Sequence, residues 1–194
     1  MGETAENAVI GEVQEELGST HRGDLKMSAG RTFDEEIKLT YKKLEESDIQ
    51  KLTLIMKNAF DADTKMHTEI EEDGPAGYDS GELLLKLMRL KNAESNVIYV
   101  DGTMAGAYTI TKDKDIFTLD MLFIEPSFAS KGIGTMVWRE IEQKYNEAKT
   151  WLVETPDYSK RNHHFYEKCG FEKLREHCCE NGEKSIVFVK YMER

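Results

Sequence analysis

One stretch of the chain, residues 119–134, restricts the fold more than any other, because it joins an apolar strand to a helix through a glycine loop. Apolar side chains dominate Leu119–Ile124, which predicts a central strand covered on both faces. Gly132 and Gly134 then open an amphipathic helix. Backbone amides past a strand end and in a first helical turn lack partners within these elements, so an anion can bind there. The stretch therefore predicts a phosphate-binding loop.

The residue types around the glycines indicate which phosphate group fits. Gly132 and Gly134 lack a Cβ, so a diphosphate can approach the main chain, and Lys131 adds a flexible positive charge. A dinucleotide fingerprint would need its third glycine where Val137 stands, and a P-loop would need its lysine after the glycine. A coenzyme A loop is the phosphate-binding interpretation that remains. The alternative is a loop whose glycines only turn the chain.

Length, charge and cysteine content limit the class of protein. The chain has 194 residues, which suits one domain with a core, and its formal net charge of −11 argues against nucleic acid and favours cationic partners. Three cysteines do not suggest a disulfide framework, so we expect a cytoplasmic location. We find neither a secretory leader nor an apolar run near the roughly 20 residues that span a bilayer, so no membrane association is expected.

Composition divides the chain into a tail and a domain. Residues 1–32 are acidic and rich in glycine, which predicts a flexible N-terminal tail with at most a conditional helix. Residues 33–194 carry the apolar periodicities of a folded domain. A capping-box spacing at Ser47 predicts one helix start, and Asp79 or Ser80 a second. Two more helices are expected after Gly132 and at 162–169, and strands at 33–41, 97–100, 104–111, 116–124, 150–155, 171–178 and 185–191.

The order of these elements predicts a mixed α/β sheet. Strand 116–124, the helix after it and strand 150–155 form a crossover, which places the two strands parallel. The pairs Asp101-Gly102 and Asn181-Gly182 are typical of tight hairpins, which join antiparallel strands.

Two motifs stand in order along the chain: the strand end Phe123–Pro126 with the loop Ala129–Gly134, and Asn162 with the block Phe165–Phe171. In this order they resemble the GNAT superfamily of acyl-CoA-dependent N-acetyltransferases. The pyrophosphate loop of that family, Q/R-x-x-G-x-G/A, follows a strand ending in hydrophobic-Val/Ile-x-Pro, and this chain has Phe123–Pro126 and then Ala129–Gly134. Ala129 replaces the family's Gln or Arg, which removes a side-chain contact and keeps the backbone cradle. The second motif, an Asn and then Phe-Tyr-Glu-Lys-x-Gly-Phe, is present as Asn162 and Phe165–Phe171.

The resemblance covers about residues 36–191 and implies a fold and a site. The fold is a mixed, mostly antiparallel sheet with parallel, splayed fourth and fifth strands and helices on both faces. Acetyl-CoA is the implied co-substrate, and the Tyr166 hydroxyl would face the thioester sulfur. The implied coenzyme-binding residues are Leu122, Phe123 and Ile124 along the pantetheine arm, Ser130, Lys131, Gly132, Ile133, Gly134 and Thr135 around the diphosphate, and Asn162.

Acetyl transfer to an amine also needs a proton acceptor, because deprotonating a lysine-like amine at pH 7 costs about 4.6 kcal/mol. Asp120 in its apolar strand and Glu154 at the end of the next are candidates, since a low dielectric can raise a carboxyl pKa. Structural pairing of Asp120 and solvation of Glu154 are the alternatives. Tyr78 and Asp79, in a turn-rich loop, are candidates to contact the amine, with a plain surface turn as the alternative.

The remaining histidines and cysteines do not predict a metal site. Adjacent residues on a strand point to opposite faces, so Cys178 and Cys179 do not easily share one ion, and no Cys-x-x-Cys pair exists. We therefore expect an N-acetyltransferase that moves an acetyl group from acetyl-CoA directly to a primary amine of a small molecule or protein, without a metal. A homodimer is compatible with this hypothesis. The alternative is a non-catalytic acyl-CoA-binding or interaction module on the same fold.

Overall fold

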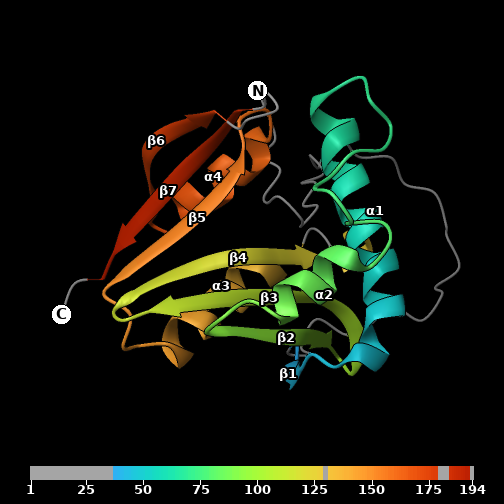
Figure 1. Ribbon diagram of the computed structural model, residues 1–194, viewed down its shortest axis with the longest axis horizontal. Helices are drawn as coiled ribbons and strands as arrows, with labels where there is room; N and C mark the ends of the chain where they lie inside the picture. Colours follow the sequence, from blue (N-terminus) through green and yellow to red (C-terminus); the bar gives the residue numbers. More distant parts are fainter. Residues whose placement is uncertain (1–36, 129–130, 179–183, 193–194) are drawn as a thin grey trace, which may run out of the picture.

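The computed structural model describes residues 37–128, 131–178 and 184–192. The predicted tail at 1–32 and the loop residue Ser130 lie outside these ranges. Within them, seven strands form one sheet in the order β1-β2-β3-β4-β5-β7-β6. All neighbouring pairs are antiparallel except β4 and β5, which are parallel. The structure confirms the predicted mixed α/β class (Figure 1).

The element bounds follow the predicted pattern with small shifts. The strands are β1 Leu39–Lys43, β2 Ala93–Val100, β3 Thr103–Asp113, β4 Ile116–Ile124, β5 Thr150–Pro156, β6 Glu172–Cys178 and β7 Lys184–Tyr191. The helices are α1 Ile49–His67, α2 Glu82–Met88, α3 Ile133–Lys144 and α4 Lys160–Lys168, with 3-10 turns at Glu46–Asp48 and Pro126–Phe128.

Two helix starts differ from the prediction. Before α1, the backbone N–H of Glu45 donates to Asp48 (3.0 Å), so the cap lies at these residues rather than at Ser47. The N-cap of α2 is Gly81 at φ +86°, not Asp79 or Ser80. A Cβ at position 81 would lie 2.9–3.0 Å from α1 side chains, so glycine allows α2 to pack closely against α1.

The hairpin between β2 and β3 is confirmed, and its turn is the predicted one. Asp101 and Gly102 both have positive φ, at 50° and 78°, which is the conformation of a two-residue type I′ turn. β6 and β7 also pair antiparallel as predicted, while the Asn181-Gly182 turn lies outside the described residues.

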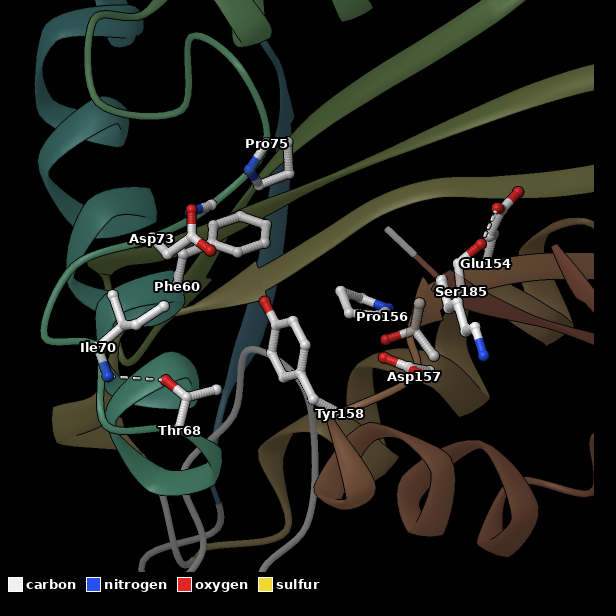
Figure 2. A pocket seen from close by; sticks show the side chains of 13 residues that line it. Phe60, Thr68, Ile70, Asp73, Pro75, Glu154, Pro156, Asp157, Tyr158 and Ser185 are labelled. Carbon is white, nitrogen blue, oxygen red and sulfur yellow. Dashed lines mark hydrogen bonds between the residues drawn. The ribbon is translucent and has the colours of Figure 1, made fainter. Parts of the chain in front are cut away.

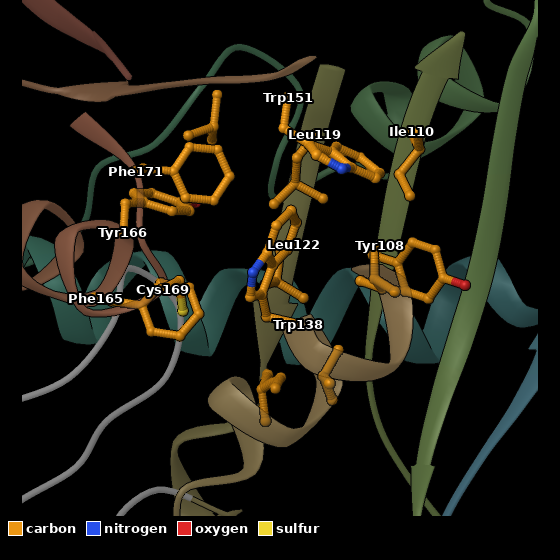
Figure 3. Packing of buried hydrophobic residues seen from close by; sticks show 14 of the residues in the cluster. Tyr108, Ile110, Leu119, Leu122, Trp138, Trp151, Phe165, Tyr166, Cys169 and Phe171 are labelled. Atoms are coloured by element: carbon orange, nitrogen blue, oxygen red, sulfur yellow. The ribbon is translucent and has the colours of Figure 1, made fainter. Parts of the chain in front are cut away.

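Apolar side chains pack against both faces of the sheet. One cluster lies between the sheet and α3 and α4, and the other between the sheet and α1 and α2. In the first, the rings of Trp138 and Trp151 are 5.1 Å apart, edge to face. Figure 3 shows these rings beside Leu119, with Tyr166 and Phe171 in the same cluster. This packing holds α3 and α4 under the strands that form the candidate site.

A charged group ties the opposite end of the sheet to α3. Glu94 of β2 accepts hydrogen bonds from Lys112 (3.1 Å) and Lys144 (2.6 Å). Burial alone would raise the pKa of Glu94, but the hydrogen bonds, led by that of Lys144, lower it to about 2. The carboxylate therefore stabilises the fold at neutral pH, and this contribution is lost as the pH falls from the unfolded-state pKa of about 4.3 toward 2.

We expect Glu94→Gln to reduce stability at pH 7 by about 1 kcal/mol, because a side chain that is one-third exposed is partly screened by solvent. Thermal unfolding should show a Tm roughly 2–4 °C below that of the unsubstituted protein at pH 7. The difference should narrow as the pH falls from about 4.3 toward 2, because the unfolded chain takes up a proton at Glu94 over this range and the ionised folded form loses its advantage. A difference that stays constant with pH would assign the loss to packing instead.

Candidate active site

The two parallel strands separate partway along their length. β4 and β5 pair only over Ile116–Leu119 and Thr150–Val153. Beyond these residues they diverge, as Figure 1 shows. Along Asp120–Ile124, β4 is paired with β3 on one edge, and its other edge faces the gap. Main-chain groups on an open edge can accept an extended ligand as an added strand. The three residues predicted to bind pantetheine fall in this segment.

The helix after β4 begins as the predicted phosphate loop requires. Its N-cap, Gly132, has φ +66°, a left-handed conformation that costs glycine no Cβ clash. The N-cap residue has no side chain with which to cap α3, and the amides of a first helical turn can bind an anion. Lys131 beside it is exposed, while Ala129 and Ser130 lie outside the described residues.

Helix α4 places Asn162 and Tyr166 on one face, since residues four apart share a face of a helix. The Asn162 side-chain amide donates to Thr155 of β5 (2.8 Å), so α4 is attached where β5 has left β4. The oxygen of the same amide group, Asn162 Oδ1, is buried and accepts no hydrogen bond from the described residues. A buried acceptor without a donor is rare. The coenzyme carries amide N–H groups that could satisfy it, so the residues present fit such a ligand.

Tyr166 is 4% exposed and packs edge to face on Phe171, with ring centroids 5.6 Å apart. Burial raises the pKa of its phenol, and the nearby Cys169 and Asp63 raise it further. The hydroxyl therefore stays protonated at neutral pH and can act as a hydrogen-bond donor. This is the state that the role predicted for Tyr166 requires.

A pocket of about 690 Å³ lies between the end of α1 and the ends of β5 and β7. Figure 2 shows Tyr158 between the two walls, with Phe60 and Ile70 on the α1 side and Pro156 on the β5 side. These lining residues could not be predicted from the sequence. They come from α1 and the loop after it, from β5 and from β7, and no local sequence pattern brings these segments together. The ionisable lining residues are Asp73, Glu154, Asp157 and Lys184, so acidic groups outnumber basic ones.

Of the two predicted proton acceptors, Glu154 lines this pocket. Its carboxylate accepts hydrogen bonds from the Ser185 hydroxyl and from His177 Nδ1, the latter at 2.6 Å. Burial alone would raise the pKa of Glu154, but these bonds outweigh it and lower the pKa. The expected raised pKa is therefore wrong for this residue, because its partners come from β6 and β7. Glu154 contributes a negative charge at neutral pH and is a weak base.

Asp120 shows the opposite behaviour. Burial raises the pKa of its carboxyl, although the Thr111 hydroxyl donates a hydrogen bond to it (2.6 Å) and partly offsets the shift. Asp120 is therefore the candidate whose environment favours the protonated form. The same hydrogen bond ties it to β3, which is the structural pairing considered above.

Tyr78 and Asp79 do not line the pocket. Tyr78 is 9% exposed, packs edge to face on Phe60 and donates its hydroxyl to Asp61 (2.9 Å). Burial, followed by this hydrogen bond, raises the pKa of Tyr78 to about 12. Asp79 is exposed on the loop beside it. The pocket geometry therefore gives no support to a contact between these two side chains and an amine.

Two further features are absent from the described part of the chain. No group of three His, Cys, Asp or Glu side chains in it is arranged to hold a metal ion. No helix there is long and apolar enough to cross a membrane.

The fold is similar to that of several solved N-acetyltransferase structures. The ribosomal-protein-S18-alanine N-acetyltransferase of Escherichia coli superposes with a TM-score of 0.60 at 15% identity, covering 81% of this chain and 96% of that one. PaiA N-acetyltransferase of Thermoplasma acidophilum, in complex with coenzyme A, superposes with a TM-score of 0.61 at 16% identity, covering 80% of this chain and 99% of that one. Spermidine N-acetyltransferase of Vibrio cholerae, in complex with CoA and spermine, superposes with a TM-score of 0.57 at 16% identity, covering 79% of this chain and 95% of that one. At these identities the similarity shows the fold.

The sequence itself assigns the family. The model of the acetyltransferase (GNAT) domain matches residues 80–192, which is more than half of the chain. This protein therefore belongs to the GNAT acetyltransferase family. Its relative YrkN of Bacillus subtilis, an uncharacterized protein, is 34% identical over 106 residues. The match covers 52% of this chain and 55% of YrkN, so the chain spans about half the length of that curated relative.

Proposed function

We propose that this protein transfers an acetyl group from acetyl-CoA directly to a primary amine. The observation that carries the proposal is the gap beyond Leu119, where β4 has an open edge and β5 holds Asn162, whose Oδ1 is buried and unpaired among the described residues. Main-chain groups of Leu122, Phe123 and Ile124 would pair with the pantetheine arm. Residues Ser130 to Thr135 would hold the diphosphate, and the acceptor amine would enter from the acidic pocket.

The role of Tyr166 follows from its environment. When the amine nitrogen bonds to the acetyl carbon and the carbon–sulfur bond breaks, negative charge develops on the sulfur. A phenol with pKa about 10 is a weaker acid than a thiol with pKa about 8.5, so complete proton transfer is uphill by roughly 2 kcal/mol. Burial raises the pKa of Tyr166 further. Tyr166 therefore stabilises the leaving sulfur by hydrogen bonding, which strengthens as charge develops.

The acidic pocket supports an acceptor that approaches as a cation. Ionised Glu154, together with Asp73 and Asp157, attracts an ammonium group, while Phe60 and Tyr158 offer apolar contact for its carbon chain. Before attack, the ammonium must lose a proton. Asp120 would accept it, because burial raises the pKa of its carboxyl while hydrogen bonds lower that of Glu154.

Calorimetry with acetyl-CoA and a thiol-release assay with primary amines test this proposal. We expect acetyl-CoA to bind, and at least one amine from a panel of alkylamines, polyamines and peptides with free N-termini to accelerate thiol release. Binding without acceleration by any amine would favour the non-catalytic acyl-CoA-binding module. An absence of binding heat would rule out both functions.

A further inference from the structure

A buried polar contact joins two helices that are far apart in sequence. The Ser159 hydroxyl donates to Asp63 Oδ2 at 2.7 Å, across a separation of 96 residues. Ser159 is fully buried, and Asp63 is 6% exposed. One turn along α1, His67 Nε2 lies 3.4 Å from the backbone N–H of Arg161. Two side chains of α1 thus contact the first turn of α4.

The hydrogen-bond roles in this contact are determined by the backbone. His67 Nδ1 lies 2.9 Å from the Asp63 carbonyl oxygen, which can only accept, so Nδ1 carries the proton. Nε2 is then an acceptor, which is what the Arg161 N–H requires. Ser159 is the N-cap residue of α4, yet its side chain makes no capping bond to its own helix. Its hydroxyl instead bonds to α1.

Stability alone does not account for a carboxylate at this place. Burial raises the pKa of Asp63, with partial compensation from Ser159, His67 and Arg161, so its ionised form is disfavoured in the fold. Its Oδ1 is buried and makes no hydrogen bond within the described residues, although His67 Nδ1 lies 3.3 Å away. Replacing both partners of a buried polar contact by apolar groups is often neutral or stabilising, so stability does not require this pair.

We propose that Asp63 is a positioning residue for acetyl transfer. Through Ser159 it fixes the first turn of α4, and therefore the placement of Asn162 and Tyr166, relative to α1. The end of α1 and the loop after it line the acceptor pocket. The contact thus holds the coenzyme side of the site in register with the acceptor side, and small misplacements of reacting groups are costly. This inference rests on the proposed acetyl transfer.

Two substitutions at position 63 separate the hydrogen bond from the charge. Asp63→Leu removes both, and we expect kcat to fall about tenfold with little change in KM for acetyl-CoA. Asp63→Asn removes the charge but keeps an oxygen that can accept from Ser159, so kcat should stay within about twofold. Ser159→Ala should reproduce the loss, and the Asp63→Leu/Ser159→Ala double variant should be no slower than either single variant. Thermal unfolding should show a lower Tm for Asp63→Leu, because the buried Ser159 hydroxyl then lacks its acceptor, and the double variant should recover part of that loss.

A control on the same helix is available. Asp61 is two residues away and bonds to Tyr78 and Lys57 instead of α4. Asp61→Leu should lower Tm and leave kcat unchanged. In a Tyr166→Phe background, Asp63→Leu should have almost no further effect on kcat, because the group it positions is already absent.

Several results would overturn the inference. These are full turnover in Asp63→Leu, equal losses in Asp63→Leu and Asp63→Asn, or additive losses of Asp63→Leu and Tyr166→Phe. If the unsubstituted protein transfers no acetyl group to any amine, the proposed function fails instead. The two failures are therefore distinguishable.

Discussion

Tyr166→Phe is expected to lower kcat for acetyl transfer about 100-fold and to leave the KM for acetyl-CoA nearly unchanged. The substitution removes one hydroxyl and keeps the ring that packs on Phe171. The lost interaction strengthens only as charge develops on sulfur, so ground-state binding should hardly change. Steady-state kinetics of thiol release at saturating amine measure the effect. Because burial raises the pKa of the phenol, Tyr166 stays protonated between about pH 6 and pH 9. The ratio of kcat in the unsubstituted protein to kcat in Tyr166→Phe should therefore stay constant over this range.

A second buried tyrosine provides the control. The Tyr145 hydroxyl at the end of α3 is buried beside Glu94 and Tyr108, and its ring packs on Trp151 within the core. Tyr145→Phe should therefore keep kcat and lower Tm by only a few degrees, since one hydrogen bond contributes about 1 kcal/mol to stability. Unchanged kcat in Tyr166→Phe would exclude the phenol from the reaction. A rise in KM for acetyl-CoA with unchanged kcat would make Tyr166 a binding residue only.

Local patterns were enough to predict the strands that form the site. β4 matches its predicted bounds, because an apolar run between turn residues depends only on neighbours in sequence. The left-handed conformation of Gly132 and the shared face of Asn162 and Tyr166 also follow from local rules, namely the needs of a tight turn and the helical repeat. The parallel pairing of β4 and β5 follows from the length of the crossover between them.

Side-chain partners distant in sequence account for what could not be predicted. The pKa of Glu154 is lowered by Ser185 and His177, which are 31 and 23 residues away. The Tyr78 hydroxyl bonds to Asp61, 17 residues away. Asp63 and Ser159 are separated by 96 residues. No periodicity records such pairs, so the sign of a pKa shift and the burial of a loop tyrosine depend on tertiary packing. The Asp63 contact had no sequence signal other than a polar residue within an amphipathic helix.

Gly106→Ala is expected to have the largest effect on stability, and it also tests the open edge of β4. Gly106 of β3 pairs with Ile124. A Cβ at position 106 would lie 2.0 Å from the carbonyl oxygen of Phe123, an atom of the sheet backbone that cannot rotate away. β3 and β4 must therefore separate locally. This should lower the free energy of unfolding by about 3 kcal/mol, as substitutions that overpack a core do. Thermal unfolding should show a Tm lower by roughly 6–12 °C.

The same displacement moves the main chain of Phe123 and Ile124, which would pair with the pantetheine arm. Calorimetry below the Tm of the variant should therefore show at least about a tenfold weaker affinity for acetyl-CoA, equivalent to 1.4 kcal/mol. Gly102→Ala is the matched control, because position 102 has a positive φ of 78° but open space around its Cβ. Gly102→Ala should lower the free energy of unfolding by about 1–2 kcal/mol through backbone strain alone, and it should leave the affinity for acetyl-CoA unchanged. If Gly106→Ala binds acetyl-CoA as tightly as the unsubstituted protein, this segment of β4 is not where the coenzyme lies.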